Sequence, residues 1–167
     1  MPEGLALEPI SQETPTQEGL VCFRMGDEWF ALRIEEVREI APIGKVTRVP
    51  NAPPGVVGVM NLRGKVLTLY DLGVTLDIPM SLDKKASQIL VLDLGDPELE
   101  VGILVEEVSQ IREVSRDLLE ENPLPEGFRA WSSYLRAIAS LDGLVFNILD
   151  LRKAVLSLIP DQGKGPE

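Results

Sequence analysis

The chain has 167 residues, enough for one domain or two small ones with a buried core. Its 16 Lys and Arg are outnumbered by 27 Asp and Glu, and nucleic acid and anionic lipid would repel the formal net charge of -11, so neither is an expected partner. The absence of histidine excludes histidine phosphoacceptors, Ser-His and Cys-His nucleophile pairs and imidazole metal ligands, so most familiar active sites cannot be built from this sequence.

The two ends of the chain differ from its middle. Residues 1–18 mix Pro, Glu, Gln and Thr without hydrophobic periodicity, and residues 159–167 have the same character. Both are predicted to be flexible tails around a folded part at 19–158. The N-terminus lacks the basic start and apolar stretch of a signal peptide, and no apolar run is long enough to span a bilayer. We therefore expect a cytoplasmic protein without direct membrane insertion.

Between the tails, short runs rich in Val, Leu and Ile are separated by Gly-Asp, Pro-Pro-Gly and Asp-Gly, which predicts ten strands. Strands of this number and spacing are typical of all-β barrels or sandwiches. Cys22, in the first strand, can form no internal disulfide and is interpreted as a buried thiol, which suits a reducing compartment. The strands are predicted at 20–25, 29–32, 45–49, 56–61, 65–70, 88–94, 99–105, 110–114, 135–141 and 144–149.

Helix is predicted only in short pieces. Ile34, Val37 and Ile40 recur every three residues, which favours a helical turn. A C-terminal helix is predicted at Leu151–Leu158, because the carboxylate of Asp150 can cap the free N–H groups of a first turn. Asp71 is interpreted as a cap in the same way.

The sequence contains an internal repeat of three matched blocks that keep their order. The pairs are "LVCFRMGD" (20–27) with "ILVLDLGD" (89–96), "RIEEVREI" (33–40) with "LVEEVSQI" (104–111), and "GVMNLRGKVLTLYDL" (58–72) with "AIASLDGLVFNILDL" (137–151). This predicts two copies of one five-strand unit, at about 19–72 and 88–151, joined by residues 73–87. Each copy alone is near the size limit for a stable core, so the copies should pack together with a groove at their seam.

The two copies differ at one hairpin corner, which reads Asn-Leu-Arg-Gly at 61–64 and Ser-Leu-Asp-Gly at 140–143. Asp-Gly supplies the positive φ angles of a tight primed turn, whereas arginine tolerates positive φ less well. Arg63 is therefore either a solvated surface residue or a partner for a carboxylate, on its own fold or on another protein. Glu39 is the candidate internal partner.

These residues resemble the CheW family of bacterial chemotaxis coupling proteins. The resemblance runs from about Leu20 to Leu158 and is carried by the Gly-Asp first hairpin, by "EEVREI" and above all by "GVMNLRGKVLTLYDL". It implies an all-β fold of two intertwined five-stranded SH3-like β-barrels with short helices. It also implies a non-catalytic adaptor, without cofactor, metal or small-molecule substrate, which joins the cytoplasmic helical hairpin tip of chemoreceptors to the regulatory domain of the histidine kinase CheA.

The resemblance further implies which residues meet each partner. The receptor-binding residues would be Arg63 and the groove positions Leu104, Val108, Ile111 and Ala137, and the kinase-binding residues would be Val37, Glu39 and Gly58. The sequence departs from the family pattern at Ala137 and Ala139, which stand at positions that are often glycine. Two added methyl groups near the groove could narrow it, with consequences for receptor affinity.

Other functions stay open at this level. The chain could be a coupling protein of a pilus, gliding or regulatory pathway, or a barrel domain detached from a CheA-like kinase. More distantly, it could be a small-molecule-binding or hydrolytic β-barrel, which requires an interior cavity with converging polar groups.

Several acidic and aromatic residues also allow two interpretations. The Glu pairs at 35–36, 106–107 and 120–121 are interpreted as solvated faces rather than as acid–base or cation sites, and Asp93 and Asp96 as turn residues rather than a phosphoacceptor pocket. Phe128 and Trp131, in the long connection at 121–131, could either fold back or touch a partner.

Overall fold

The computed structural model describes residues 16–80, 87–121 and 131–156, which form two sheets of six strands each. The strands are β1 (Gln17–Met25), β2 (Glu28–Arg33), β3 (Val37–Pro42), β4 (Val46–Thr47), β5 (Val56–Leu62), β6 (Lys65–Tyr70), β7 (Gln88–Leu92), β8 (Val101–Val105), β9 (Glu107–Ser115), β10 (Leu119–Glu121), β11 (Leu135–Leu141) and β12 (Leu144–Leu149). The helices are α1 (Leu72–Leu76) and α2 (Leu151–Leu156), and the 3₁₀ turns are η3 (Ile34–Glu36), η4 (Arg116–Leu118) and η5 (Ser132–Tyr134).

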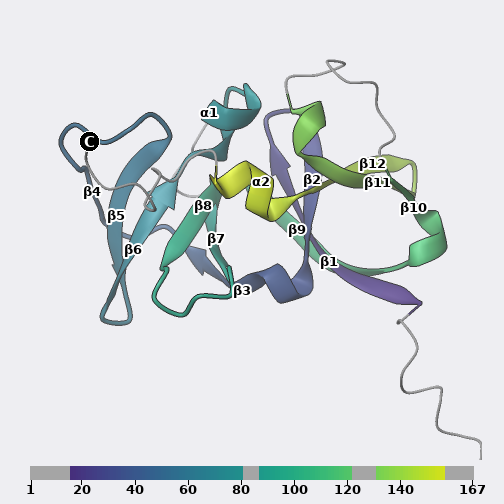
Figure 1. Cartoon of the computed structure of the whole chain (residues 1–167), viewed down its shortest axis with the longest axis horizontal. Coiled ribbons are helices and arrows are strands. Elements are labelled where there is room, and N and C mark those ends of the chain that lie inside the picture. Colours follow the sequence, from purple (N-terminus) through teal and green to yellow (C-terminus); the bar gives the residue numbers. More distant parts are fainter. Residues whose placement is uncertain (1–15, 81–86, 122–130, 157–167) are drawn as a thin grey trace, which may run out of the picture.

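Each sheet takes strands from both copies of the repeat. The first barrel has the strand order β10-β11-β12-β2-β1-β9, and the second has the order β3-β7-β8-β6-β5-β4. The first two strands of each copy therefore lie in the barrel that the other copy completes, and the two barrels stand side by side with α2 between them (Figure 1). The copies are joined by two parallel pairs, β2 with β12 and β6 with β8, and by two antiparallel pairs, β1 with β9 and β3 with β7. The predicted fold of two intertwined β-barrels is confirmed, but each sheet has six strands rather than five, because β3 and the short β10 were not among the ten predicted strands.

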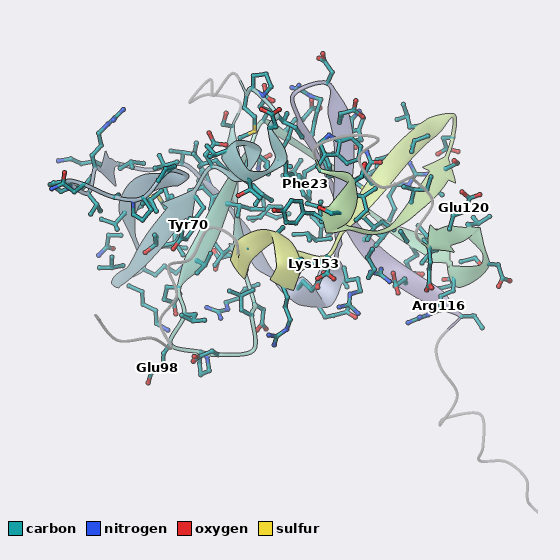
Figure 2. All side chains as sticks on the ribbon, turned by 45° about the horizontal axis from the view of Figure 1, so that its top comes forward. Phe23, Tyr70, Glu98, Arg116, Glu120 and Lys153 are labelled. Atoms are coloured by element: carbon teal, nitrogen blue, oxygen red, sulfur yellow. The ribbon has the colours of Figure 1, made fainter. Side chains whose placement is uncertain are left out.

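Apolar side chains form three separate cores. One fills the first barrel and one fills the second, and the largest lies between the barrels. Strand β1 is apolar at successive positions because both of its faces are covered by a core. Alternate residues of a strand point to opposite faces. Leu20 and Cys22 point into the first-barrel core, while Phe23 and Met25 point into the inter-barrel core. Figure 2 shows Phe23 in the middle of the molecule.

The predicted helical turn at 34–40 is only partly correct. A single 3₁₀ turn ends at Glu36, whose carboxylate accepts a hydrogen bond from the Arg33 backbone N–H at 3.0 Å, and the chain then extends as β3. The pairing of β3 with β7 shifts register between Val37 and Glu39. This bulge places Val37 and Ile40 on the same face, against the inter-barrel core. A spacing of three therefore arose from a bulged strand rather than from a helix.

Both predicted aspartate caps are confirmed. Asp71 Oδ1 accepts the Gly73 N–H at 2.9 Å, and Asp150 Oδ1 accepts the Lys153 N–H at 3.2 Å. Helix α2 begins at the predicted residue, and its last described residue is Leu156. Strand β1 begins at Gln17, two residues before the predicted start of the folded part. Of the predicted tails, residues 1–15 and 159–167 lie outside the described residues.

The described residues contain no helix with the length and apolarity needed to cross a membrane.

Cys22 gives a direct test of the first-barrel core. The residue is fully buried, and this burial raises the pKa of its thiol to about 11, because the thiolate loses hydration inside the barrel. At pH 8 only about 0.1% of such a thiol is ionised, and the thiolate is the reactive form. We expect Ellman's reagent to label Cys22 in denaturing urea but not in the folded protein. Complete labelling within minutes in the absence of urea would contradict this packing.

Candidate functional site

The corner that carries Arg63 has the same backbone as its counterpart in the second copy. Arg63 and Gly64 have φ angles of 53° and 85°, and Asp142 and Gly143 have angles of 51° and 81°. The side chain of Asn61 accepts a hydrogen bond from the Gly64 N–H at 3.1 Å and holds the turn. Arg63 thus occupies a left-handed conformation that costs an arginine more than it costs an aspartate. The benefit of arginine at this position must come from its side chain.

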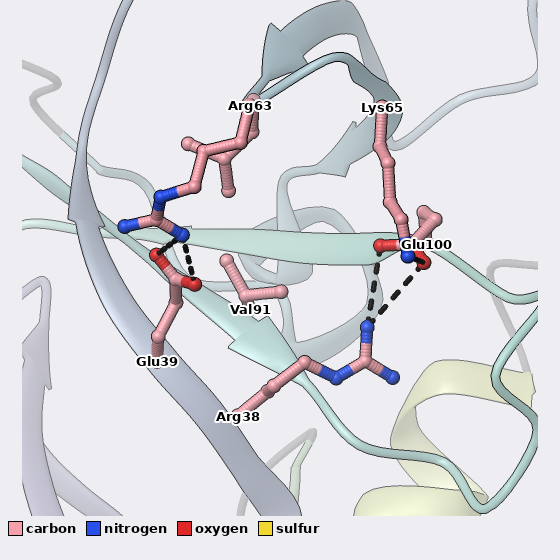
Figure 3. A pocket seen from close by; sticks show the side chains of 7 residues that line it. Arg38, Glu39, Arg63, Lys65, Val91 and Glu100 are labelled. Atoms are coloured by element: carbon pink, nitrogen blue, oxygen red, sulfur yellow. Dashed lines mark hydrogen bonds and ion pairs between the residues drawn. The ribbon is translucent and has the colours of Figure 1, made fainter.

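The side chain of Arg63 reaches from the β5–β6 turn to β3, where it meets Glu39. Arg63 Nη1 donates to both carboxylate oxygens of Glu39, at 2.5 and 2.6 Å, and this pair confirms the internal partner predicted from the sequence (Figure 3). The hydrogen bond to Glu39 and its negative charge raise the pKa of Arg63 above its ordinary value, so the guanidinium stays charged. Its side chain is 72% exposed, which leaves it accessible.

The Arg63–Glu39 pair borders a surface depression of about 220 Å³ on the second barrel. On the opposite border, Glu100 is paired with Arg38 at 3.2 Å and with Lys65 at 3.6 Å. Val91 lies between the two groups of charges (Figure 3). The depression therefore has charged side chains on two of its borders, while Val91 between them is only 2% exposed and belongs to the second-barrel core.

A second candidate surface lies on the first barrel, at the edge strand β9. The pairing of β9 with β1 shifts register, so that Val108 is opposite Phe23 and Ile111 is opposite Val21. Because directly opposite residues share a face, this bulge places Val108 and Ile111 together on the face that carries the inter-barrel core. Val108 is half-buried, whereas Ile111 is 54% exposed. Ile111 is thus the accessible apolar residue of the predicted groove.

Two other predicted receptor-binding residues lie inside the barrels. Leu104 is buried in the second-barrel core, and Ala137 is buried in the first-barrel core together with Ala139. The methyl groups of both alanines therefore fill the first barrel and do not project into a surface groove. Leu104 and Ala137 can affect a binding surface only through the strands that they support.

The predicted kinase-binding residues are also placed differently from one another. Glu39 is partly exposed beside Arg63, so the predicted receptor-binding and kinase-binding sets meet at this pair. Val37 packs against the inter-barrel core. Gly58 is buried where β5 passes β4, and a Cβ atom there would lie 2.4 Å from the carbonyl oxygen of Thr47. Any role of Gly58 in binding is therefore to allow this close approach.

Sequence reasoning missed three charged residues of the depression. Arg38 and Lys65 are sequence neighbours of Glu39 and Gly64, and this adjacency was the available signal. Glu100 comes from the other copy of the repeat and gave no local signal. It is placed by the parallel pairing of β6 with β8, where the Thr68 N–H donates to the Glu100 carbonyl oxygen at 3.0 Å.

The acidic residues considered as alternative sites make internal contacts. Glu36 binds Arg33, and the buried carboxylate of Glu106 accepts the Gly26 N–H. The prediction that these two residues lie on solvated faces is therefore wrong. Asp93 and Asp96 accept backbone N–H groups two residues ahead, at 3.0 and 2.9 Å, which confirms that they are turn residues.

Of the two aromatic residues in the connection at 121–131, only Trp131 is among the described residues. Trp131 folds back, because it is buried and packs edge-on against Phe30 with ring centroids 5.3 Å apart. Phe128 lies outside the described residues.

Comparison with known proteins identifies the family of the chain. The CheW-like domain matches residues 19–157, a range that includes both barrels and the Arg63 corner. The chain belongs to the CheW family. It is 33% identical over 133 residues to chemotaxis protein CheW of Rhizobium meliloti, covering 79% of this chain and 83% of that protein. It is 28% identical over 159 residues to CheW of Bacillus subtilis, covering 92% of this chain and 99% of that protein.

Two further similarities extend the comparison to structure and to another system. The crystal structure of the scaffolding protein TtCheW from Thermoanaerobacter tengcongensis matches with a TM-score of 0.71 and 26% identity, covering 83% of this chain and 87% of that chain. Protein PilI of Pseudomonas aeruginosa is 30% identical over 117 residues, covering 70% of this chain and 65% of that protein. As a CheW-family member, the protein is a chemotaxis scaffold or adaptor.

Proposed function

We propose that this protein couples chemoreceptors to the histidine kinase CheA, as a non-catalytic adaptor in the cytoplasm that associates with receptor arrays. The observation that carries the proposal is the family match over residues 19–157, which includes the Asn-Leu-Arg-Gly corner. The receptor would place the helical hairpin of its cytoplasmic tip against Ile111 and Val108, and the regulatory domain of CheA would bind near Glu39. Arg63 is proposed to contact the receptor, as the family resemblance implies.

Physical considerations support an adaptor that makes modest contacts. An amphipathic receptor helix would bury the exposed apolar side chain of Ile111, and apolar area removed from water contributes about 25 cal/mol per Å² before ordering costs. A single weak contact is sufficient when many adaptors, receptors and kinases are linked, because linked binding sites gain avidity through effective concentration.

A coupling protein of a non-flagellar pathway is a second candidate, and the similarity to PilI favours it specifically. The same two surfaces would then serve a different receptor and kinase. The small-molecule barrel is less well supported, because apolar side chains such as Phe146 in the first barrel and Leu69 in the second fill both interiors. Binding to CheA and receptor fragments taken from each pathway would separate the first two candidates.

Replacing Ile111 with aspartate tests the receptor-binding face without disturbing a core. We expect the Kd for a purified receptor cytoplasmic fragment to rise about ten-fold, because an apolar contact is lost and a charge would be desolvated. Affinity for the CheA regulatory domain should change less. Isothermal titration calorimetry measures both values.

The matched control is Val145→Asp, since Val145 is a strand residue of the first barrel that is 50% exposed, close to the 54% of Ile111. Equal receptor affinity of the two folded variants would contradict the proposed face. A wild-type protein that binds neither fragment would contradict the proposed function itself.

A further inference from the structure

The sulfur of Met60 lies directly beneath the connection between β3 and β4, at one edge of the second barrel. Gly44 in this connection is exposed, and its backbone N–H donates a hydrogen bond to Met60 Sδ at 3.0 Å. A Cβ atom on Gly44 would lie 3.3 Å from Sδ, so the glycine leaves the sulfur without a side chain above it at this point. Met60 is only 4% exposed, but an exposed backbone segment is its cover here.

This cover is held by few contacts. Strand β4 is the edge strand of its sheet and consists of two residues, which pair with β5 through Val46–Met60 and Thr47–Val59 (Figure 1). The residues at 44–45 and 47–50, on both sides of Val46, are exposed. A segment with few pairings and much exposed backbone opens at a lower free energy than the whole fold does. The sulfur of Met60 therefore becomes reachable while the barrels stay folded.

The two other methionines among the described residues have different cover. Met25 is fully buried in the inter-barrel core, on a strand that is paired on both sides by β2 and β9. Solvent reaches its sulfur only when the barrels come apart. Met80 is half-buried and packs against the edge of that core. Met80 is thus a reference for an accessible thioether, and Met25 for a protected one.

We propose that Met60 is a site of reversible oxidation by hydrogen peroxide, which releases the β3–β4 connection from the barrel. A sulfur lone pair attacks one peroxide oxygen, the O–O bond breaks, and the departing hydroxide takes up a proton and leaves as water. The sulfur loses two electrons to the peroxide and becomes a sulfoxide, which methionine sulfoxide reductases convert back to the thioether.

The geometry around the sulfur explains why the oxidation would move the connection. The Gly44 nitrogen and Met60 Sδ are 3.0 Å apart, which leaves no room for an oxygen atom between them. In the other direction lies the apolar core that Met60 shares with Leu67 and Leu69, where a polar sulfoxide without a hydrogen bond is unfavourable. The sulfoxide oxygen can accept the Gly44 N–H only when the connection shifts outward.

Peroxide treatment at several urea concentrations below the unfolding transition tests the access route, with the oxidation of each methionine followed by peptide mass spectrometry. We expect Met60 to be oxidised about ten-fold faster than Met25. The rate at Met60 should depend little on urea, because local opening exposes little surface, whereas the rate at Met25 should rise steeply. Equal rates at the two residues, or the same urea dependence, would overturn the inference.

Met60→Leu tests the structural effect, with Met80→Leu as its matched control. Leucine has nearly the volume of methionine and cannot be oxidised. We expect peroxide to lower the urea unfolding midpoint of the wild type and of Met80→Leu but not that of Met60→Leu, and methionine sulfoxide reductases to restore it. An equal loss in Met60→Leu, an unchanged midpoint of oxidised wild type, or failure of the reductases would contradict the proposal. These measurements need no partner protein, so their failure leaves the proposed function intact.

Discussion

Gly58→Ala is expected to lower the free energy of unfolding by about 3 kcal/mol. A Cβ atom at this position would lie 2.4 Å from the Thr47 carbonyl oxygen and 2.8 Å from Val46 Cγ1, so β4 would have to move away from β5. The φ angle of 156° is also one that residues with a side chain rarely adopt. The loss of stability is measured as the shift of the urea unfolding midpoint at constant m-value.

The control for this variant is Gly143→Ala. Gly143 has a φ of 81° but no atom within 4 Å of the added Cβ, so alanine there costs only its conformational strain, about 1 kcal/mol. Equal destabilisation by the two alanines would show that the contact with β4 is not tight. If Gly58→Ala also weakens binding to CheA, displacement of β4 explains the effect without any direct contact between Gly58 and the kinase.

Glu18→Gln is expected to lower the free energy of unfolding by about 2 kcal/mol. Glu18 is only 5% exposed, and its carboxylate pairs with Arg136 at 2.6 Å and with Arg116 at 3.4 Å. These contacts join β1 to β11 and to η4 within the first barrel. A neutral amide would leave two arginines without their buried counter-charge. The cost is moderated because the arginine side chains are 26% and 43% exposed and keep part of their hydration.

Glu107→Gln is the matched control for Glu18→Gln. Glu107 pairs with Arg24 at 3.1 Å, but its side chain is 54% exposed, and exposed ion pairs contribute less than about 1 kcal/mol. A urea unfolding midpoint for Glu18→Gln that equals the midpoint for Glu107→Gln would contradict the stabilising role of the buried carboxylate.

The fold could be predicted because its signals are local or repeated. The Asp-Gly and Arg-Gly corners specify hairpins, and the three matched blocks reveal the duplication. The exchange of strands between copies left no signal in hydrophobic spacing, and the resemblance to a known family supplied it. The prediction of a helical turn at 34–40 was correct only for residues 34–36, because a bulge after Val37 gives the strand that follows a spacing of three.

The candidate site was predictable in part, where its signals are local in the sequence. Arg63 and Glu39 were paired correctly, because the corner residue is anomalous in sequence and carboxylates nearby are few. Glu100 was missed because parallel pairing between the copies places it there. Leu104 and Ala137 were assigned to a groove from the family pattern, but the sequence does not specify which face of their strands is exposed, and the structure places both side chains in barrel interiors.

The exchange of two strands between the barrels has a mechanical consequence. The two copies of the repeat cannot be separated without breaking the parallel pairs of β2 with β12 and of β6 with β8, and the barrels themselves are packed together by the inter-barrel core. We therefore expect the two halves to unfold as one cooperative unit and to resist bending relative to each other. Ile111 on one barrel and Glu39 on the other are then held at a constant separation, so a receptor and a kinase bound as proposed would be spaced at a fixed distance.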